Sequence, residues 1–174
     1  MCKNILWEYI RQTIQETHRV NLLEIQNKLE AMLLKRAWEP FFKYIFEEFY
    51  KLASIRDFIF REEGVKCFLL AYLGLSYVYE LYSETELNKG YADIYIKPNL
   101  TSHPTMCKNH YLVELKHLSQ ADLKPKPSQK LIDQTIKQAK AQLDQYANDS
   151  LIPKDVIKII AITSNSELLH LSAY

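Results

Sequence analysis

The feature that most constrains the fold of this chain is a pair of short runs with the alternating pattern of β-strands. In the first run, over residues 90–96, Ala92 and Ile94 alternate with Asp93 and with tyrosines. Because successive side chains of a strand point to opposite faces of a sheet, Asp93 is expected on the face opposite to Ala92 and Ile94. Pro98 is expected to end this strand, since proline donates no backbone hydrogen bond.

The second run, over residues 110–118, carries an acidic and a basic residue two positions apart. Glu114 and Lys116 therefore share one face of the expected strand, while Val113 and Leu115 take the other. When an Asp, a Glu and a Lys converge from neighbouring strands, they form a Mg²⁺ site with a cation beside it. The pattern thus favours hydrolysis of phosphodiester bonds, provided that the two strands are adjacent.

Apolar periodicity predicts helices before these strands. Through residues 4–53 apolar side chains recur at helical spacing, and Asn21 is a candidate N-cap for one helix. Pro40 suits the first turn of the next helix, which is rich in aromatic residues. These aromatics are too numerous for one helix face, so we expect a partner domain to cover part of them. The aromatic residues are Trp38, Phe41, Phe42, Tyr44, Phe46, Phe49 and Tyr50.

The rest of the chain alternates between helix and strand patterns. A helix is predicted over residues 56–74, ended by Gly74, and a turn is predicted at Lys89 and Gly90. The other predicted elements, in chain order, are a strand over 77–87, loops over 99–109 and 119–128, a helix over 130–147, and strands over 156–163 and 168–174.

Composition narrows the class of function. The net charge of the 174-residue chain is +1, so its global charge does not by itself require a nucleic-acid partner. Residues 108–140 hold seven lysines against three acidic residues, which fits either a nucleic-acid contact or a solvated helix face. With three glycines in the whole chain, glycine-rich phosphate-binding loops are excluded.

Cysteine and hydropathy patterns exclude further classes. The three cysteines are too few and too scattered for a disulfide framework or a zinc site, and the five histidines lack metal-ligand spacing. No apolar stretch approaches the length of a membrane span, and the N-terminus lacks the pattern of a signal peptide. We therefore expect a protein of the reducing cytoplasm that makes no contact with membranes.

Asp93 followed by Glu114-Leu115-Lys116 resembles the motif of the PD-(D/E)XK nuclease superfamily, which has an Asp on one strand and an acid, any residue and Lys on the next. Ala92 replaces the usual Pro before the Asp, at a position that varies widely in the superfamily. Three further segments resemble the nuclease-like domain at the C-terminus of bacterial AAA-ATPase-like proteins, over roughly residues 56–165. They are Arg56-Asp57-Phe58-Ile59-Phe60, Glu84-Thr85-Glu86-Leu87-Asn88-Lys89-Gly90 and Gln142-Leu143-Asp144-Gln145-Tyr146.

The resemblance implies an α/β fold with a restriction-endonuclease-like core, in which a mixed sheet is flanked by helices. Residues 56–174 would form this domain. Residues 1–55 would form a helical segment that joins it to, or remains from, an ATPase-like region. The implied partners are nucleic acid, DNA before RNA, and an ATPase-like domain or partner chain. Because the glycine-rich loop is missing, the ATPase nucleotide site would lie outside this chain.

The strand residues have expected roles in catalysis. The expected cation is Mg²⁺ or Mn²⁺, bound by Asp93, Glu114 and the carbonyl of Leu115, because hard cations take oxygen ligands. Lys116 would hold or polarise the attacking water and offset the negative charge that builds on the phosphate during attack.

Two helices are expected to complete the site. The upstream helix should supply a further acid, and Glu62 is preferred over Glu63 because it shares a helix face with Val65 and because the family pattern places its acid there. Gln142 and Tyr146 lie four positions apart, hence on one face of the long helix. In the resembled nucleases, such a pair contacts the substrate phosphate or orients the metal-bound acid.

Each of these residues also has a plain structural interpretation. Asp93 could cap a turn, and Glu114 could form a cross-strand ion pair on an exposed strand face. Glu62, Gln142 and Tyr146 could be ordinary helix surface. Two whole-chain alternatives stay open beside the nuclease: an inactive nuclease fold that binds or docks beside an ATPase, and a protein-interaction domain built on the N-terminal aromatic residues.

Overall fold

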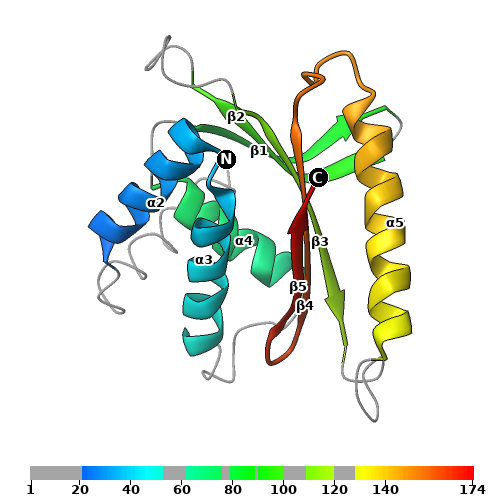
Figure 1. Ribbon diagram of the computed structural model, residues 1–174, viewed down its shortest axis with the longest axis horizontal. Helices are drawn as coiled ribbons and strands as arrows, with labels where there is room; N and C mark the ends of the chain where they lie inside the picture. The colour runs from blue at the N-terminus through cyan, green and yellow to red at the C-terminus, as the bar shows by residue number, and fades with distance from the viewer. Residues whose placement is uncertain (1–20, 53–61, 76–78, 89, 100–108, 120–127) are drawn as a thin grey trace.

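The structure is a computed structural model that describes residues 21–52, 62–75, 79–88, 90–99, 109–119 and 128–174 (Figure 1). The helix expected before residue 21, the expected domain boundary at 55–56 and most of the two expected loops lie outside these residues. The described elements, in chain order, are α2 (Leu22–Lys35), α3 (Trp38–Leu52), α4 (Glu62–Leu73), β1 (Tyr79–Leu87), β2 (Gly90–Pro98), β3 (Tyr111–Leu118), α5 (Gln129–Ala147), β4 (Ile157–Ser164) and β5 (Leu168–Ala173).

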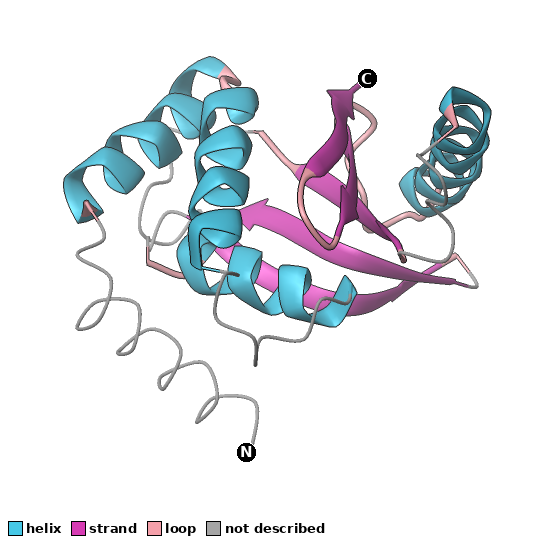
Figure 2. Cartoon of the chain, turned by 90° about the horizontal axis from the view of Figure 1, so that it is seen from below, coloured by secondary structure: helices cyan, strands magenta, loops and turns pink. Residues whose placement is uncertain are grey.

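The strands form one mixed sheet in the order β1-β2-β3-β4-β5. Neighbouring strands pair antiparallel except β3 and β4, which run parallel. A parallel pair needs a long crossover connection, and α5 lies in it. Helices α2, α3 and α4 cover one face of the sheet and α5 covers the other, as Figures 1 and 2 show. The predicted α/β fold with a mixed sheet flanked by helices is therefore confirmed.

Local sequence signals place the helix ends. The Asn21 side chain accepts a hydrogen bond from the backbone three residues on, at 3.1 Å, as predicted for the N-cap of α2. Pro40 lies in the first turn of α3, where its missing N–H has no helical partner to lose. Ser128 caps α5 in the same way as Asn21 caps α2, at 3.2 Å. Helix α4 ends directly before Gly74, as predicted.

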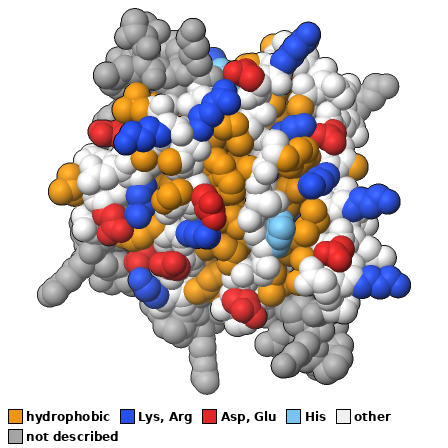
Figure 3. Space-filling view, viewed as in Figure 1, with side chains coloured by type: hydrophobic (Ala, Val, Ile, Leu, Met, Phe, Trp, Pro, Cys, Tyr) orange, Lys and Arg blue, Asp and Glu red, His pale blue; other side chains and the backbone are white. Residues whose placement is uncertain are grey.

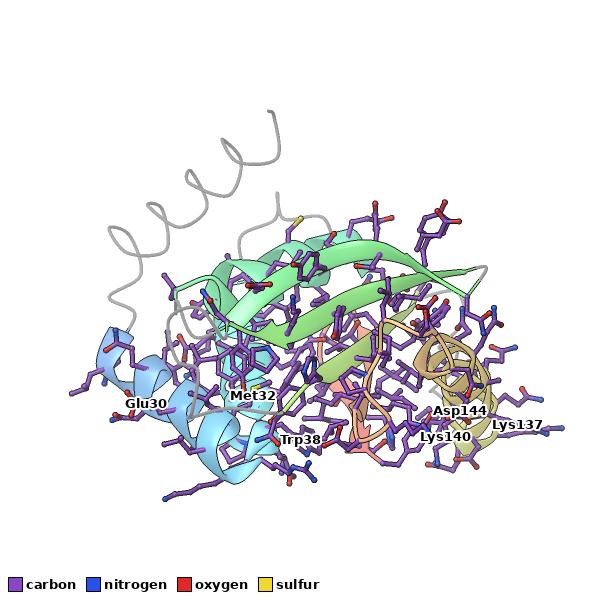
Figure 4. All side chains as sticks on the ribbon, turned by 90° about the horizontal axis from the view of Figure 1, so that it is seen from above. Glu30, Met32, Trp38, Lys137, Lys140 and Asp144 are labelled. Atoms are coloured by element: carbon purple, nitrogen blue, oxygen red, sulfur yellow. The ribbon has the colours of Figure 1, made fainter. Side chains whose placement is uncertain are left out.

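The sheet divides the apolar core into two clusters. One cluster joins α2, α3 and α4 to the sheet, and the hydroxyl of Tyr111 on β3 donates a hydrogen bond to the carbonyl of Met32 on α2 at 2.7 Å. The other cluster joins α5 to the opposite face of the sheet. Figure 4 shows Met32 and Trp38 at one end of this arrangement and Lys137 of α5 at the other. The N-terminal helices are therefore packed into the same core as the strands.

Four of the seven aromatic residues of α3 are buried by the chain itself, and the other three are partly exposed, so no missing partner domain is needed to cover most of them. Phe41, Phe42, Phe46 and Phe49 are all 5% exposed or less. Phe49 meets Phe68 of α4 edge-on, with 5.2 Å between the ring centroids. Because α3 packs against both α2 and α4 and against the sheet cluster, more than one of its faces is buried.

The hairpin of β1 and β2 loses its regular alternation at Asp93. The strand pairing skips Glu84 and Asp93, which lie opposite each other, and Glu84 adopts a left-handed φ of 53°. Ala92 packs in the cluster on the α5 side of the sheet, whereas Ile94 packs in the cluster on the α2–α4 side. The prediction that Ala92 and Ile94 share a face is therefore wrong, because an irregular pair in the ladder reorients the side chains that follow it.

The turn between β1 and β2 is also built differently from the prediction. Asn88 supplies the left-handed backbone, with φ of 44°, and β2 already begins at Gly90. Gly90 is required for packing instead, since a Cβ at this position would lie 2.6 Å from a ring carbon of Tyr146. Lys89 lies outside the described residues.

Candidate active site

The candidate site lies at a fork between β2 and β3. Backbone pairing between these strands covers Ile94–Ile96 and Tyr111–Val113. Asp93 and Glu114 are the next residues on the two strands. The Asp93 carboxylate accepts a hydrogen bond from the backbone N–H of Leu115 at 2.8 Å, so its side chain bridges the two strands at the fork.

Glu114 is a buried acid that is only partly satisfied. Its side chain is 2% exposed, and one carboxylate oxygen accepts a hydrogen bond from the Lys116 ammonium at 2.6 Å. The other oxygen, Oε2, is buried and has no hydrogen-bond partner among the described residues. Burial raises the pKa of Glu114 to about 7, and the negative charge of Asp93 adds to this, although the Lys116 hydrogen bond opposes it.

Lys116 is held in its charged form. Burial acts to lower the pKa of its ammonium group, but the hydrogen bond and the negative charge of Glu114 outweigh burial and raise it overall. The side chain keeps 26% of its surface exposed, so a ligand can reach it from solvent. Glu114 and Lys116 therefore form a hydrogen-bonded ion pair in which the lysine, but not the glutamate, is accessible from solvent.

Helix α4 brings Glu62 to the same fork. Burial raises the pKa of the Glu62 carboxyl, and the negative charge of Asp93 raises it further against the opposing charges of Lys116 and Lys66. Glu62 is half-buried, whereas Glu63 beside it is exposed. The structure thus brings Glu62 into the electrostatic field of the strand residues.

Lys66 is a site residue that the sequence interpretation missed. It lies one helical turn after Glu62 and is 9% exposed. Its ammonium group is 3.2 Å from Glu84 Oε1 and 3.7 Å from Asp93 Oδ1. A lysine on the apolar side of a helix, beside Val65, is the signal that could have identified it, because buried lysines need an acidic partner.

Helix α5 places Tyr146 near the strand acids. Burial raises the pKa of the Tyr146 hydroxyl, the charge of Glu114 raises it further, and a hydrogen bond with Gln142 opposes this. The ring of Tyr146 lies directly over Gly90, where a side chain would collide with it. Gln142 and Tyr146 are therefore neighbours, and the negative charges of Glu114 and Asp93 both raise the pKa of the Tyr146 hydroxyl.

The carboxylates of the fork meet some of the requirements of a site for a hard cation such as Mg²⁺. Among the described residues, no group of three or more His, Cys, Asp and Glu side chains is arranged to hold a metal ion. Lys66 and Lys116 are instead paired with Asp93 and Glu114. The unpartnered buried oxygen of Glu114 is nevertheless a strong acceptor, and Asp93 bridges the fork beside it. Oxygen ligands of this kind fit Mg²⁺ or Mn²⁺.

Comparison with known proteins agrees with this fold. The family model described as the PD-(D/E)XK nuclease superfamily matches residues 60–170, more than half of the chain, from just before α4 into β5, and the match includes the fork. This defines a nuclease-like α/β fold. The chain belongs to the PD-(D/E)XK nuclease superfamily, whose members usually use divalent metals. No curated protein and no solved structure gives a significant match.

The surface shows no strong charge segregation on the face seen in Figure 3, where acidic and basic side chains are interspersed with apolar ones. In the described part of the chain, no helix has the length and apolar character needed to cross a membrane. The expected position beside an AAA-ATPase-like region stays a prediction.

Proposed function

We propose that this chain is a metal-dependent nuclease domain that hydrolyses phosphodiester bonds of nucleic acid, with DNA as the first candidate. The carrying observation is the half-satisfied carboxylate of Glu114 beside Asp93 at the fork. A buried oxygen without a partner is costly in free energy, by about 1–3 kcal/mol or more. A bound cation would remove that cost.

The proposed cation ligands are Asp93, Glu114 and the carbonyl of Leu115. When bound, Mg²⁺ or Mn²⁺ would polarise the phosphate and lower the pKa of a water molecule. Ionised Asp93 and Glu114 are the forms that bind a cation, so a proton must leave Glu114 first, given its pKa of about 7. Binding is therefore expected to strengthen as the pH rises toward that value.

Lys116 and Glu62 have proposed roles beside these ligands. The ammonium of Lys116, kept charged by Glu114, can orient the attacking water and offset the charge that builds on the phosphate. Glu62 approaches from α4 and carries a raised pKa, which suits a group that holds or passes a proton near the fork. Both side chains come from regular elements that fix their directions.

Gln142 and Tyr146 are proposed to contact the substrate phosphate or to orient the carboxylate of Glu114. Tyr146 is 4% exposed, and its hydroxyl lies within the fields of both strand acids. Its buried ring is fixed against Gly90, so the position of the hydroxyl is tightly defined. The proposed role follows from this placement and from the resemblance of the Gln-x-x-x-Tyr pair to that of related nucleases.

A second candidate is a catalytically inactive nuclease fold that binds or docks in an ATPase-associated protein. The observation that favours it is Lys66, whose ammonium lies 3.7 Å from Asp93 and offsets the charge that a cation would use. In an active site, a metal ion would have to replace the Lys66 ammonium as the partner of Asp93. A docking module could keep the Lys66–Asp93 pair as it is.

Metal titration separates the two candidates. Mg²⁺ or Mn²⁺ is titrated into metal-stripped protein by calorimetry, and cleavage of linear DNA and of RNA is followed in the same preparations from a nuclease-deficient host. Asp93→Ala should abolish both binding and cleavage, while Asp133→Ala, at an exposed acid of α5, should preserve both. If the wild-type chain neither binds metal nor cleaves, even when joined to an ATPase partner, the docking module is the better account.

A further inference from the structure

A pocket lies outside the fork, on the α5 side of the β1–β2 hairpin. It has a volume of about 280 Å³ and is lined chiefly by apolar and aromatic side chains. Leu87 and Tyr95 of its wall belong to the core cluster that α5 shares with the sheet. Leu151, after α5, closes one side and is 72% exposed, so the rim has an apolar surface open to solvent.

Three planar rings form a stack in the wall of this pocket. The rings of Tyr82 and Tyr95 are 6.0 Å apart between centroids, with 29° between their planes. The rings of Tyr95 and His110 are 5.9 Å apart, with 19° between their planes. Tyr95 is 6% exposed and fixed between its neighbours, whereas Tyr82 is 42% exposed. The pocket therefore presents a rigid aromatic wall with an open end at Tyr82.

The polar groups of the pocket carry little net charge. The Tyr95 hydroxyl and His110 Nδ1 are 2.7 Å apart and share a hydrogen bond. Burial lowers the pKa of His110, so its ring is neutral at pH 7. Lys97 lies 6.0 Å from the centre of the Tyr82 ring, but its charge is balanced by Glu80 at 3.2 Å. Such a lining selects a flat, uncharged, hydrogen-bonding ring rather than a phosphate.

The pocket lies next to the proposed cleavage site. Tyr95 follows Asp93 by two residues on β2, about 7 Å at a rise of roughly 3.3 Å per strand residue. Thr85 of the pocket directly follows Glu84, the residue opposite Asp93. Successive nucleotides of one DNA strand rise by about 3.4 Å in a duplex. A strand with a phosphate at the fork would thus place a base one or two nucleotides away at the pocket.

We infer that the pocket built on the Tyr82–Tyr95–His110 stack binds a nucleobase of a single-stranded segment next to the phosphodiester at the fork. This inference rests on the proposed nuclease function and makes single-stranded or frayed nucleic acid the substrate class. A paired base inside a duplex cannot enter a recess in a protein wall without leaving its stack, at a cost of a few kcal/mol. An unpaired base pays no such cost and gains about 1–3 kcal/mol from stacking on an aromatic side chain.

The test measures binding alone, by fluorescence anisotropy in metal-free buffer. The probes are a labelled single-stranded DNA of about 12 nucleotides, within the usual site sizes of such proteins, the same sequence as RNA, and its blunt duplex. Tyr82→Ala should weaken single-strand binding about 5- to 150-fold, corresponding to the stacking free energy of one base, about 1–3 kcal/mol. Tyr82→Phe should restore it, and binding of the duplex should not depend on residue 82.

Tyr91→Ala is the matched control. Tyr91 is a tyrosine of the same hairpin that is 63% exposed, but it alternates with Ala92, which packs on the α5 side, and so points away from the pocket. Its replacement should leave single-strand affinity within twofold. Should Tyr82→Ala lower thermal stability, Thr85→Phe serves as a second variant, since it fills the pocket from β1 and should weaken binding in the same way.

The outcomes distinguish this inference from the proposed function. A wild-type preference for single strands that disappears in Tyr82→Ala supports the base pocket, whether or not the protein cleaves, and the tighter of the DNA and RNA probes identifies the source of the base. Equal affinity of wild-type, Tyr82→Ala and Thr85→Phe for single strands would overturn the inference. So would a clear wild-type preference for the duplex. Metal-dependent cleavage alongside either result would leave the nuclease proposal standing.

Discussion

At the scale of single residues, the fork combines two acids, Asp93 and Glu114, that have different partners and different exposure to solvent. Glu114 is nearly inaccessible and has one oxygen without a partner, whereas Asp93 is held by a backbone N–H and faces Lys66. Lys116 satisfies half of Glu114 and remains open to a ligand. The two lysines neutralise the acids within the chain, whereas under the proposed function a cation would do so, and each lysine can be tested separately.

Lys116→Ala should separate binding from catalysis. Its ammonium matters most when negative charge builds on the phosphate during attack, so cleavage should fall by about 10²-fold or more. At a pH above the pKa of Glu114 in the variant, metal affinity should stay almost intact or rise slightly, because a like charge leaves the site. Calorimetry and a cleavage assay on metal-stripped protein measure the two effects. Lys137→Ala, at an exposed lysine of α5, is the control. Loss of metal binding in Lys116→Ala would argue against this division of roles.

Lys66→Met should tighten metal binding by about 10-fold, because the ammonium 3.7 Å from Asp93 Oδ1 competes with a cation for the same carboxylate. Methionine keeps the aliphatic stem that packs in α4 and removes only the charge. Titration of Mn²⁺ into the metal-stripped variant gives the affinity directly. Lys51→Met, which removes an exposed ion pair with Glu48 on α3, should have no effect. Unchanged affinity in Lys66→Met would show that Lys66 does not oppose the metal.

At the scale of elements, the β1–β2 hairpin and α5 position the site together. Asn88 makes the turn, Gly90 lets β2 pass beneath Tyr146, and the irregular pair of Glu84 and Asp93 redirects the strand. The Asn88 backbone N–H also donates to the carboxylate of Asp149, just beyond α5, at 2.8 Å. The hairpin is thereby tied to the end of the helix that carries the Gln-x-x-x-Tyr pair.

Gly90→Ala should destabilise the fold by about 1–3 kcal/mol, the usual cost of forcing extra atoms into a packed site. The added Cβ would lie 2.6 Å from a Tyr146 ring carbon, so β2 and α5 must separate. Denaturant unfolding of Gly90→Ala, Tyr146→Leu and the double variant measures the coupling. If the cost comes from this contact, Gly90→Ala is less harmful in the Tyr146→Leu background. Additive effects would place the cost elsewhere.

The sequence predicted these elements well where the signal was local. The Asn21 cap, Pro40 in the first turn of α3 and the end of α4 before Gly74 all depend on neighbours within a few positions. The alternation of residues 92–94 failed because it depends on Glu84, which lies on another strand and takes a left-handed backbone. Periodicity in one strand carries no information about an irregularity that its partner introduces.

The candidate site was likewise predictable from the sequence where its residues belong to a local motif, and not where they meet only through folding. Asp93, Glu114 and Lys116 follow from a short motif on two strands, and the structure brings them to one fork with Glu62. Lys66 was not predictable in the same way, because its partners Glu84 and Asp93 become neighbours only after α4 packs on the sheet. The same holds for the ring stack of the base pocket, which joins three strand regions.

At the scale of the whole molecule, one of the two core clusters couples the N-terminal helices to the sheet. The Tyr111 hydroxyl on β3 bonds the carbonyl of Met32, and the Tyr50 hydroxyl on α3 bonds the carbonyl of Ser164 at 3.1 Å. Helix α2 therefore supports β3, which carries Glu114 of the fork, and α3 supports the neighbouring strand β4. This packing buries most of the aromatic side chains that suggested a protein-interaction domain, and that alternative loses much of its support.

The whole-molecule stability of the metal-free protein should fall as the pH rises from about 4.5 to about 7. Glu114 has a pKa near 4.5 when unfolded and about 7 when folded, so the native state binds the proton more tightly across this window. The loss amounts to at most about 3.5 kcal/mol, since one pKa unit corresponds to about 1.4 kcal/mol. Denaturant unfolding of metal-stripped protein between pH 5 and pH 8 measures it.

Glu114→Gln should reduce this slope to the part that Glu62 contributes through its own raised pKa, because the amide has no proton to lose. Glu86→Gln, at an exposed acid of β1, should keep the full slope. Saturating Mg²⁺ should reverse the slope for the wild-type chain, since the cation binds the ionised carboxylate and stabilises the native state that holds it. Glu114→Gln should lack this reversal. If Mg²⁺ stabilises wild-type and Glu114→Gln equally at pH 8, the cation does not bind through Glu114, and the proposed metal site is wrong.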